Sequence, residues 1–289
     1  MNRCILISVS VLVVGACAAW LGWRSLAQRQ EWDSRIGNGR IRYVLLNALS
    51  AANPDIRVEF DQLAQNGHNI SEAVGEDGVI EVVLDSRHLR RDESYPHHDA
   101  IRLRQGGLFG IPSTAGGRLS GALRYFAGDR DETLPSQADL KRTLSRLSHT
   151  DVLLQAVVKL KQPLPEKSLP TTTPIPQPLD IEAVLLSPGA PGQKPISWDV
   201  NDCKYRLPSG PCTQGLAAQF QAWVQSLTPE DAQPLERIGL NYEELQLRAR
   251  ELKMYGFIAE STPEVLAWLI QQPEVARVEL TDIGFLHSS

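Results

Sequence analysis

Several residue types are scarce in this sequence of 289 residues, and each scarcity excludes a class of protein. Four cysteines are too few for a disulfide-dense mini-protein, and 21 glycines are too few for collagen. Basic residues are not in excess, because 29 Lys and Arg stand against 34 Asp and Glu, a formal net charge of −5. Since phosphate binding needs concentrated positive charge, we expect no nucleic-acid partner. Hydrophobic residues make up 42% of the chain, enough for a buried core.

Motifs for catalysis and cofactor binding are also missing from the sequence. It contains no GxSxG, no GxGxxG that opens a helix and no P-loop. The densest group of metal-ligand residue types is His97-His98-Asp99, with His88 nearby. Because the helical histidine spacing of zinc motifs is absent, we interpret this group as a solvated loop. We therefore predict no catalytic residue, no cofactor and no metal, and we favour a protein that is not an enzyme.

The amino terminus holds a long uncharged run. Residues 5–23 are 19 consecutive residues without a charge, and Trp20 and Trp23 lie at one end of the run. At about 1.5 Å per residue, a helix of this length nearly spans a hydrocarbon core of roughly 30 Å. Two alternatives stay open: a cleaved signal peptide, and a lipoprotein with Cys17 as the acylated residue. We favour the uncleaved anchor, because the residues that follow Cys17 remain apolar.

Each of these alternatives places the bulk of the chain at or beyond a membrane. The prediction is a single-pass protein of the cell membrane, with most of the chain extracytoplasmic, in the periplasm or outside the cell. We divide the chain into an anchor over residues 1–30, a small α+β region over 31–130 and an α+β domain over 136–289. The overall fold class expected is α+β.

Two of the four cysteines lie outside the apolar run, at Cys203 and Cys212. The intervening Pro208-Ser209-Gly210-Pro211 predicts a turn that could bring the two sulfurs together. A zinc site would need two further ligands, and none stands nearby in the sequence. We interpret the pair as one disulfide in an oxidising compartment, which agrees with export.

Hydrophobic periodicity predicts alternating helices and strands in the rest of the chain. The first half reads as a helix at residues 40–51, strands at 56–60, 78–84 and 101–109, and a helix at 136–147. The second half begins with a β-branched strand at 152–160 and a second strand at 181–186, joined by a proline-rich connection. Helices follow at 214–227 and 242–252, the second capped by Asn241. The chain then predicts a strand at 254–260, a short helix that begins with Pro263, and a strand at 275–283.

The segment from residue 255 to 279 resembles the C-terminal half of subtilase propeptides and the related proteinase inhibitors. The matching positions are Gly256, Phe257, Ala259, Thr262, Glu264, Leu266, Pro273, Val275, Val278 and Glu279. The resemblance implies a ferredoxin-like βαββαβ sandwich, with residues 152–160 and 181–186 as its first two strands. The proline-rich and cysteine-containing segments would then be insertions into this sandwich.

The resemblance also implies a role in protein–protein recognition. We expect a non-catalytic interaction module with a protein partner outside the cytoplasm. Its partner-binding residues would be Phe257, Glu279, Asp282 and Phe285, on the last two strands and the tail. The alternative is an exported hydrolase or small-ligand-binding enzyme whose site residues meet only in three dimensions, around His88, His97 and Asp99.

Overall fold

The computed structural model describes residues 39–58, 79–87, 89, 98–104, 117–128, 136–148, 150–169, 179–199 and 215–285. The predicted anchor, Cys17, the Cys203–Cys212 pair, His88 and His97 lie outside these residues. Within them, none of the helices has the length and apolar character needed to cross a membrane.

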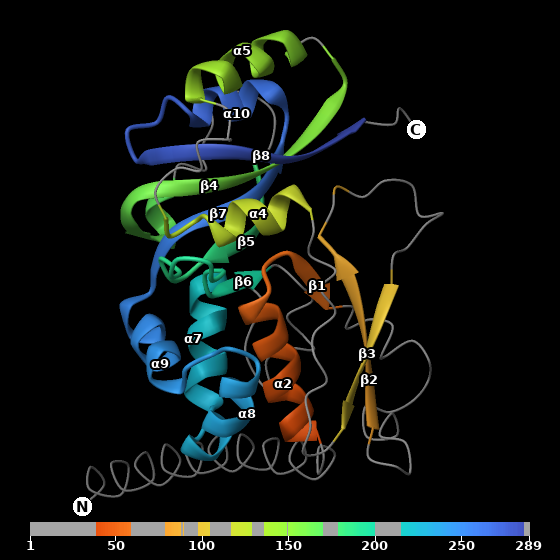
Figure 1. Ribbon diagram of the computed structural model, residues 1–289. Coiled ribbons are helices and arrows are strands. Elements are labelled where there is room, and N and C mark those ends of the chain that lie inside the picture. Colours follow the sequence, from red (N-terminus) through yellow and green to blue (C-terminus); the bar gives the residue numbers. More distant parts are fainter. Residues whose placement is uncertain are drawn as a thin grey trace, which may run out of the picture.

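A five-stranded antiparallel sheet forms the centre of the molecule (Figure 1). Its strand order is β6-β5-β7-β4-β8. The bounds are β4 (Val152–Pro165), β5 (Asp180–Leu185), β6 (Ser197–Asp199), β7 (Lys253–Ser261) and β8 (Val275–Phe285). The strands predicted from the sequence in this half are confirmed, and so is the α+β class. Strand β6 was not predicted, because its three residues carry too little periodicity to be recognised.

Helices from both halves of the chain share one core on the first face of the sheet. Helices α5 (Gln137–Leu147) and α10 (Pro263–Leu269) pack together beside β4 and β8. Helix α7 (Leu216–Ser226) packs on β5 and β6, and α9 (Tyr242–Glu251) packs on α7. Helix α8 (Ala232–Arg237) lies between α9 and α2 (Gly39–Ala52). Short 3₁₀ turns occupy Glu166–Ser168 and Pro229–Asp231.

An aromatic cluster fills this core beneath the β5–β6 edge. Trp198, Phe220 and Trp223 are fully buried, and their ring centroids lie 5.4 to 5.9 Å apart. Such tilted and edge-on pairs contribute about 0.5–1.5 kcal/mol each beyond the area they bury. The cluster joins β6 to α7, so Trp198 and Trp223 are packing residues of the core.

The opposite face of the sheet is covered by the short helix α4 (Arg118–Arg124). Leu119, Leu123 and Phe126 pack on the apolar side chains of β4, β5 and β7. Figure 1 shows α4 in front of the sheet. Because α4 has only seven residues, it covers only a part of this face. Charged side chains of the sheet lie beyond both ends of the covered part.

The first half of the chain adds a small sheet with the order β1-β2-β3. Its strands are β1 (Ile56–Val58), β2 (Val79–Ser86) and β3 (His98–Arg104). The prediction of a loop at His98-Asp99 is wrong, because these residues pair with Asp85 and Leu84 of β2. Apolar residues of α2 and β1 belong to the same core as the larger sheet, so this part of the first half does not have a separate core.

The outer edge of the large sheet is blocked at β8. The side-chain amide of Gln137 donates to the carbonyl oxygen of Val278 (3.0 Å) and accepts from its N–H (3.3 Å). Gln137 therefore takes the hydrogen bonds that an added strand would make at this residue. Blocking an exposed edge in this way protects a sheet from pairing with other chains.

Candidate interaction surface on the helix α4 side of the sheet

The face of the sheet that carries α4 has three rows of side chains that run across the strands. In the middle row, Val157, Ile258 and Ala183 lie opposite one another in the strand register and pack under α4. The row on one side of it is polar and acidic, and the row on the other side is basic. Since cross-strand neighbours lie about 4.5–5.5 Å apart, side chains within each row are in contact range.

The acidic end consists of Gln155, Glu182, Glu260 and Asp282. Gln155 lies opposite both Glu260 and Asp282 in the register of the sheet. The register shifts between Ile181 and Ala183, which places Glu182 in a bulge of β5. Gln155 Nε2 donates to Glu182 (3.2 Å), and Gln155 Oε1 accepts from the Thr281 hydroxyl (2.9 Å).

Two arginines from the first half of the chain cover this acidic end. Arg57 of β1 donates to Glu182 Oε1 at 2.7 Å. Arg87, only 3% exposed, donates to Asp199 at 2.8 Å and lies 3.9 Å from the second oxygen of Glu182. These contacts compensate the charge of buried carboxylates, which would otherwise be costly to remove from water.

Further hydrogen bonds hold the arginines in place. Arg87 Nε donates to the carbonyl oxygen of Pro54 (2.8 Å), and the Ser50 hydroxyl donates to Asp199 (3.1 Å). Nearby, Lys194 Nζ contacts both carboxylate oxygens of Asp55, at 2.6 and 2.7 Å. The acidic end is thus a structural junction between the first half of the chain and the sheet.

One carboxyl group at this junction has an unusual affinity for its proton. Burial, followed by the charge of Glu182 and a hydrogen bond with it, raises the pKa of Glu260 to about 8. The charge of Arg57 lowers this pKa and that of Asp180 raises it further. The combined effect of burial, Glu182 and Asp180 is larger than the effect of Arg57. At neutral pH the Glu260 carboxyl therefore keeps its proton for most of the time.

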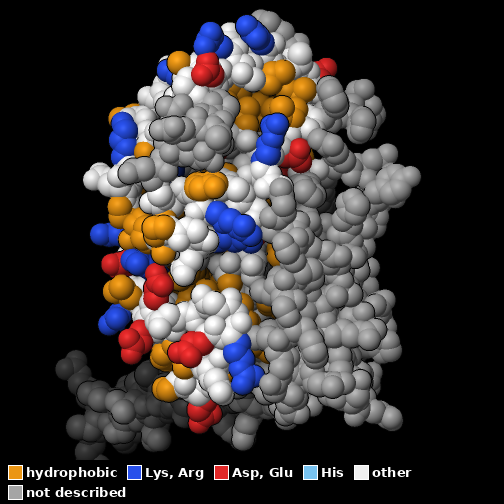
Figure 2. Space-filling view, viewed as in Figure 1, with side chains coloured by type: hydrophobic (Ala, Val, Ile, Leu, Met, Phe, Trp, Pro, Cys, Tyr) orange, Lys and Arg blue, Asp and Glu red, His pale blue; other side chains and the backbone are white. Residues whose placement is uncertain are grey.

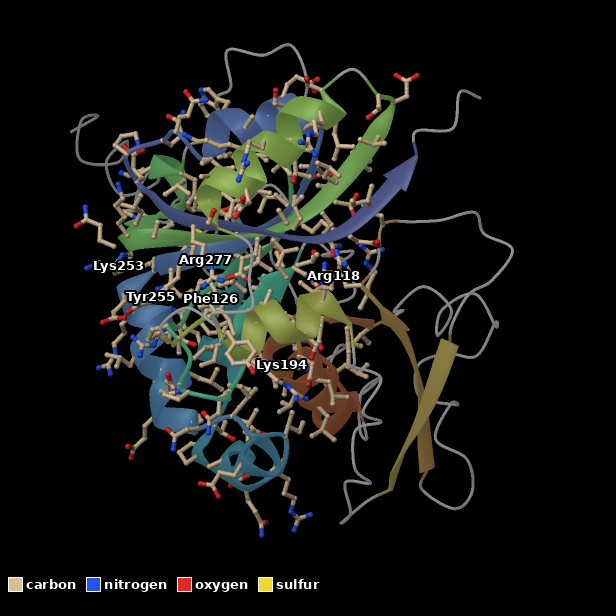
Figure 3. The ribbon with its side chains drawn as sticks, turned by 45° about the horizontal axis from the view of Figure 1, so that its top comes forward. Arg118, Phe126, Lys194, Lys253, Tyr255 and Arg277 are labelled. Atoms are coloured by element: carbon tan, nitrogen blue, oxygen red, sulfur yellow. The ribbon has the colours of Figure 1, made fainter. Side chains whose placement is uncertain are left out.

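The basic end of the same face consists of Lys159, Lys253, Arg277 and Arg248, with the rings of Phe126 and Tyr255 among them. Lys159 of β4 lies opposite Arg277 of β8 in the register. Lys159 Nζ lies 5.5 Å from the centre of the Phe126 ring, and Arg248 lies 5.5 Å from that of Tyr255. Figure 3 shows Lys253, Tyr255, Phe126 and Arg277 near the C-terminal end of α4, with Arg118 at its other end.

The cations of the basic end differ in how their charges are balanced. Arg277 pairs with Glu279 at 2.6 Å, and Arg248 pairs with Glu251 at 2.9 Å. Within the part of the chain that the structure describes, Lys159 and Lys253 have no carboxylate partner. Figure 2 shows Lys and Arg side chains interspersed with hydrophobic ones on the side of the molecule where α4 lies.

The residues that the sequence predicted as partner-binding are spread over the fold. Phe257 is fully buried in the core on the other face, because alternation along β7 turns it toward the helices, so it is not available to a partner. Glu279 lies beside the basic end in its ion pair with Arg277. Asp282 belongs to the acidic end and accepts from the N–H of Leu89 at 3.1 Å. The side chain of Phe285 lies outside the described residues.

Asp282 is the one residue of the two charged ends that was predicted as partner-binding, and the others were not predicted. A usable signal was present for the acidic end, because Gln155 and Glu182 interrupt otherwise apolar strands. A polar residue inside such a strand indicates a partner in the fold. No comparable signal marked Lys159, because it lies near the end of the strand predicted at 152–160, where a lysine usually lies in solvent; β4 continues to Pro165.

A separate groove of about 400 Å³ lies between the β5–β6 turn and the start of α9. It is lined in part by Gly189, Gly192 and Gly239, all with positive φ, and by Lys194. The Lys194 charge is already balanced by Asp55. The described residues contain no cluster of three or more metal-ligand side chains, here or elsewhere.

Comparison with protein-family models, with curated proteins and with solved structures gives no match to this chain. The function must therefore be inferred from the arrangement of its own residues.

Proposed function

We propose that this protein is a membrane-anchored, extracytoplasmic interaction module without catalytic activity, and that it binds a protein partner through the basic end of the helix α4 face. The observation that carries the proposal is the contrast between the two ends of that face. The acidic end is covered by Arg57 and Arg87 of the same chain, whereas Lys159 and Lys253 of the basic end have no carboxylate partner among the described residues.

The proposed fold of the second half is a ferredoxin-like sandwich. The order β5-β7-β4-β8, with each neighbouring pair antiparallel, supports it. Helix α10 connects β7 to β8, as the second crossover of such a sandwich requires. The described part of the first crossover carries only the turn at Glu166–Ser168, while α7, α8 and α9 enter between β6 and β7. The order of the strands therefore supports a ferredoxin-like sandwich, but the connections between the strands differ from those of a simple βαββαβ fold.

Binding of a partner on the helix α4 face, rather than at an edge of the large sheet, agrees with how the two edge strands are protected. Gln137 blocks β8 at Val278, and the other edge strand, β6, has only three residues. Addition of a strand from a partner is therefore disfavoured at both edges. The basic end is the part of the helix α4 face that remains for a partner.

Site-specific photo-crosslinking of the full chain tests this proposal. A photoreactive phenylalanine analogue would replace Lys159 or Lys253, and the control positions would be Lys141 and Gln271, exposed on the α5–α10 side. We expect a discrete adduct with one protein from the two basic-end positions and none from the controls. Equal adducts from all four positions, or adducts from the control positions alone, would show that the partner does not bind at this face.

A further inference from the structure

We infer that the partner presents an acidic, extended segment of polypeptide to the basic end of the helix α4 face. This inference rests on the proposed function and specifies the chemistry of the partner.

Two like charges are paired across neighbouring strands at the basic end. Lys159 and Arg277 lie directly opposite each other on β4 and β8, and their register neighbours Val157 and Glu279 fix both on the helix α4 side. Like charges in this arrangement destabilise a sheet. Glu279 balances only one charge of the pair. An added carboxylate would balance the second positive charge and remove the remaining repulsion. The arrangement therefore favours binding of an anion.

At the acidic end of the same face, two segments of the chain itself, β1 and the end of β2, bring Arg57 and Arg87 to the carboxylates of the sheet. The basic end has the opposite charge and lies on the same surface, two rows away. Charge complementarity therefore calls for a segment that carries carboxylates.

Three cations of the basic end are recessed rather than fully exposed. Arg277 is only 17% exposed at its side chain, and Lys159 is half-buried with its ammonium over the Phe126 ring. Arg248 is similarly recessed beside Tyr255, with a side-chain exposure of 14%. A flat lipid surface would reach such recessed cations poorly, whereas single side chains of an extended peptide can enter between the rings. We therefore commit to a polypeptide segment rather than to a lipid surface.

Binding of fluorescein-labelled octaglutamate to the full chain in detergent, followed by anisotropy, tests the inference. We expect saturable binding that weakens as salt rises, because exposed charges are screened. Lys159→Glu should weaken binding at least tenfold. Lys253→Glu changes an exposed side chain and should weaken it several-fold without affecting the fold. Lys141→Glu on α5 is the matched charge reversal and should leave binding within twofold.

Three results would overturn the inference. One is a loss with Lys141→Glu equal to that with Lys253→Glu, which indicates unspecific attraction. Another is binding of labelled octaglutamine as tight as that of octaglutamate. The third is Lys253-dependent binding to vesicles with anionic lipid but not to octaglutamate, which assigns the basic end to a membrane surface.

The peptide-binding and crosslinking experiments together distinguish failure of this inference from failure of the proposed function. If the adducts at Lys159 form but octaglutamate neither binds nor competes with them, the interaction module stands and the acidic partner is wrong. If octaglutamate binds but no adduct forms at either basic-end position, the surface has its predicted chemistry and the proposed protein partner is wrong.

Discussion

Arg57 Nη2 donates a hydrogen bond of 2.7 Å to Glu182 Oε1, an ion pair that joins β1 to β5 across 125 positions of sequence. The pair connects the first half of the chain to the large sheet at a bulge in β5. The neighbouring Arg87 and Asp199 are also charged and buried. Substitutions in this network should therefore change the free energy of unfolding more than substitutions in surface ion pairs do.

Removal of Arg87 should be strongly destabilising. Arg87→Gln leaves Asp199, which is 2% exposed, without its arginine partner at 2.8 Å. An uncompensated buried charge of this kind costs about 3–5 kcal/mol. Urea denaturation followed by circular dichroism should show this loss in the free energy of unfolding.

The control for Arg87 is Arg142, whose ion pair with Asp139 on α5 is exposed. Arg142→Gln should change the free energy of unfolding by less than about 0.5 kcal/mol, since exposed pairs contribute little. Similar losses in the two variants would contradict the view that burial makes the Arg87 pair important.

Stability should decrease with rising pH because of Glu260. Its pKa is raised from 4.5 to about 8 in the folded protein, by burial first and then by Glu182. Between these two pH values the folded state binds more protons than the unfolded state, so the free energy of unfolding falls as pH rises. The contribution is complete below pH 4.5 and is lost as pH rises through about 8.

Glu260→Gln cannot ionise and should remove this fall. At pH 9 the variant should be more stable than the parent protein by at least about 1 kcal/mol, since one pKa unit corresponds to about 1.4 kcal/mol. Thermal denaturation from pH 5 to 9 measures the difference. Glu236→Gln on the surface of α8 is the control, and an equal flattening of the pH profile by that variant would rule out the assignment to Glu260.

Gly256 is required by the close approach of the Val158 carbonyl oxygen and, next, of the Phe126 ring. A Cβ atom at this position would lie against the carbonyl oxygen of Val158 and 2.8 Å from the Phe126 ring. Gly256→Ala should lower the free energy of unfolding by about 1–3 kcal/mol, the usual cost of overpacking. It should also displace Phe126 from Lys159 and weaken octaglutamate binding.

Gly121 in α4 provides the comparison for Gly256. A Cβ atom there meets nothing within 4 Å, so Gly121→Ala should be neutral or stabilising, because alanine favours helix. The denaturant midpoint should fall for Gly256→Ala and should stay at or above the parental value for Gly121→Ala. If both variants were equally destabilised, the contacts of Gly256 with Val158 and Phe126 would not be the cause.

Loss of Gln137 should expose the edge of the large sheet. Gln137→Ala removes both hydrogen bonds to the main chain of Val278 and leaves an N–H and a carbonyl open to another strand. We expect faster aggregation on mild heating, measured by light scattering. Gln271→Ala on the surface after α10 should aggregate at the parental rate, and equal rates for the two variants would argue against edge protection.

Local sequence patterns were sufficient to predict most of the described elements of the second half. The β-branched run of β4 and the cap of α9, where Asn241 accepts from Glu244 N–H at 2.9 Å, are examples. Helix α4 is not among the elements predicted from the sequence, because it is short and contains Gly121 in its middle. Packing of Leu119 and Leu123 on the sheet stabilises it, and this contact is not visible in local sequence.

The charged rows could not be predicted, because they depend on pairings between distant strands. Arg87 and Asp199 are 112 positions apart, and Lys159 meets Arg277 only through the register of β4 and β8. Periodicity identifies which residues share a face of one strand, but not which strand lies beside it. The bulge that places Glu182 beside Arg57 is equally invisible in the sequence.

Helix α2 begins at Gly39 and is fixed in the core, which limits how far the protein can operate from its proposed anchor. If the proposed anchor ends at Trp23, the 15 positions between Trp23 and Gly39 can span at most about 50 Å, whatever their conformation. On the proposed function, the partner's acidic segment would then have to lie within a limited height above the membrane, so chain length would restrict the choice of partner as well as charge.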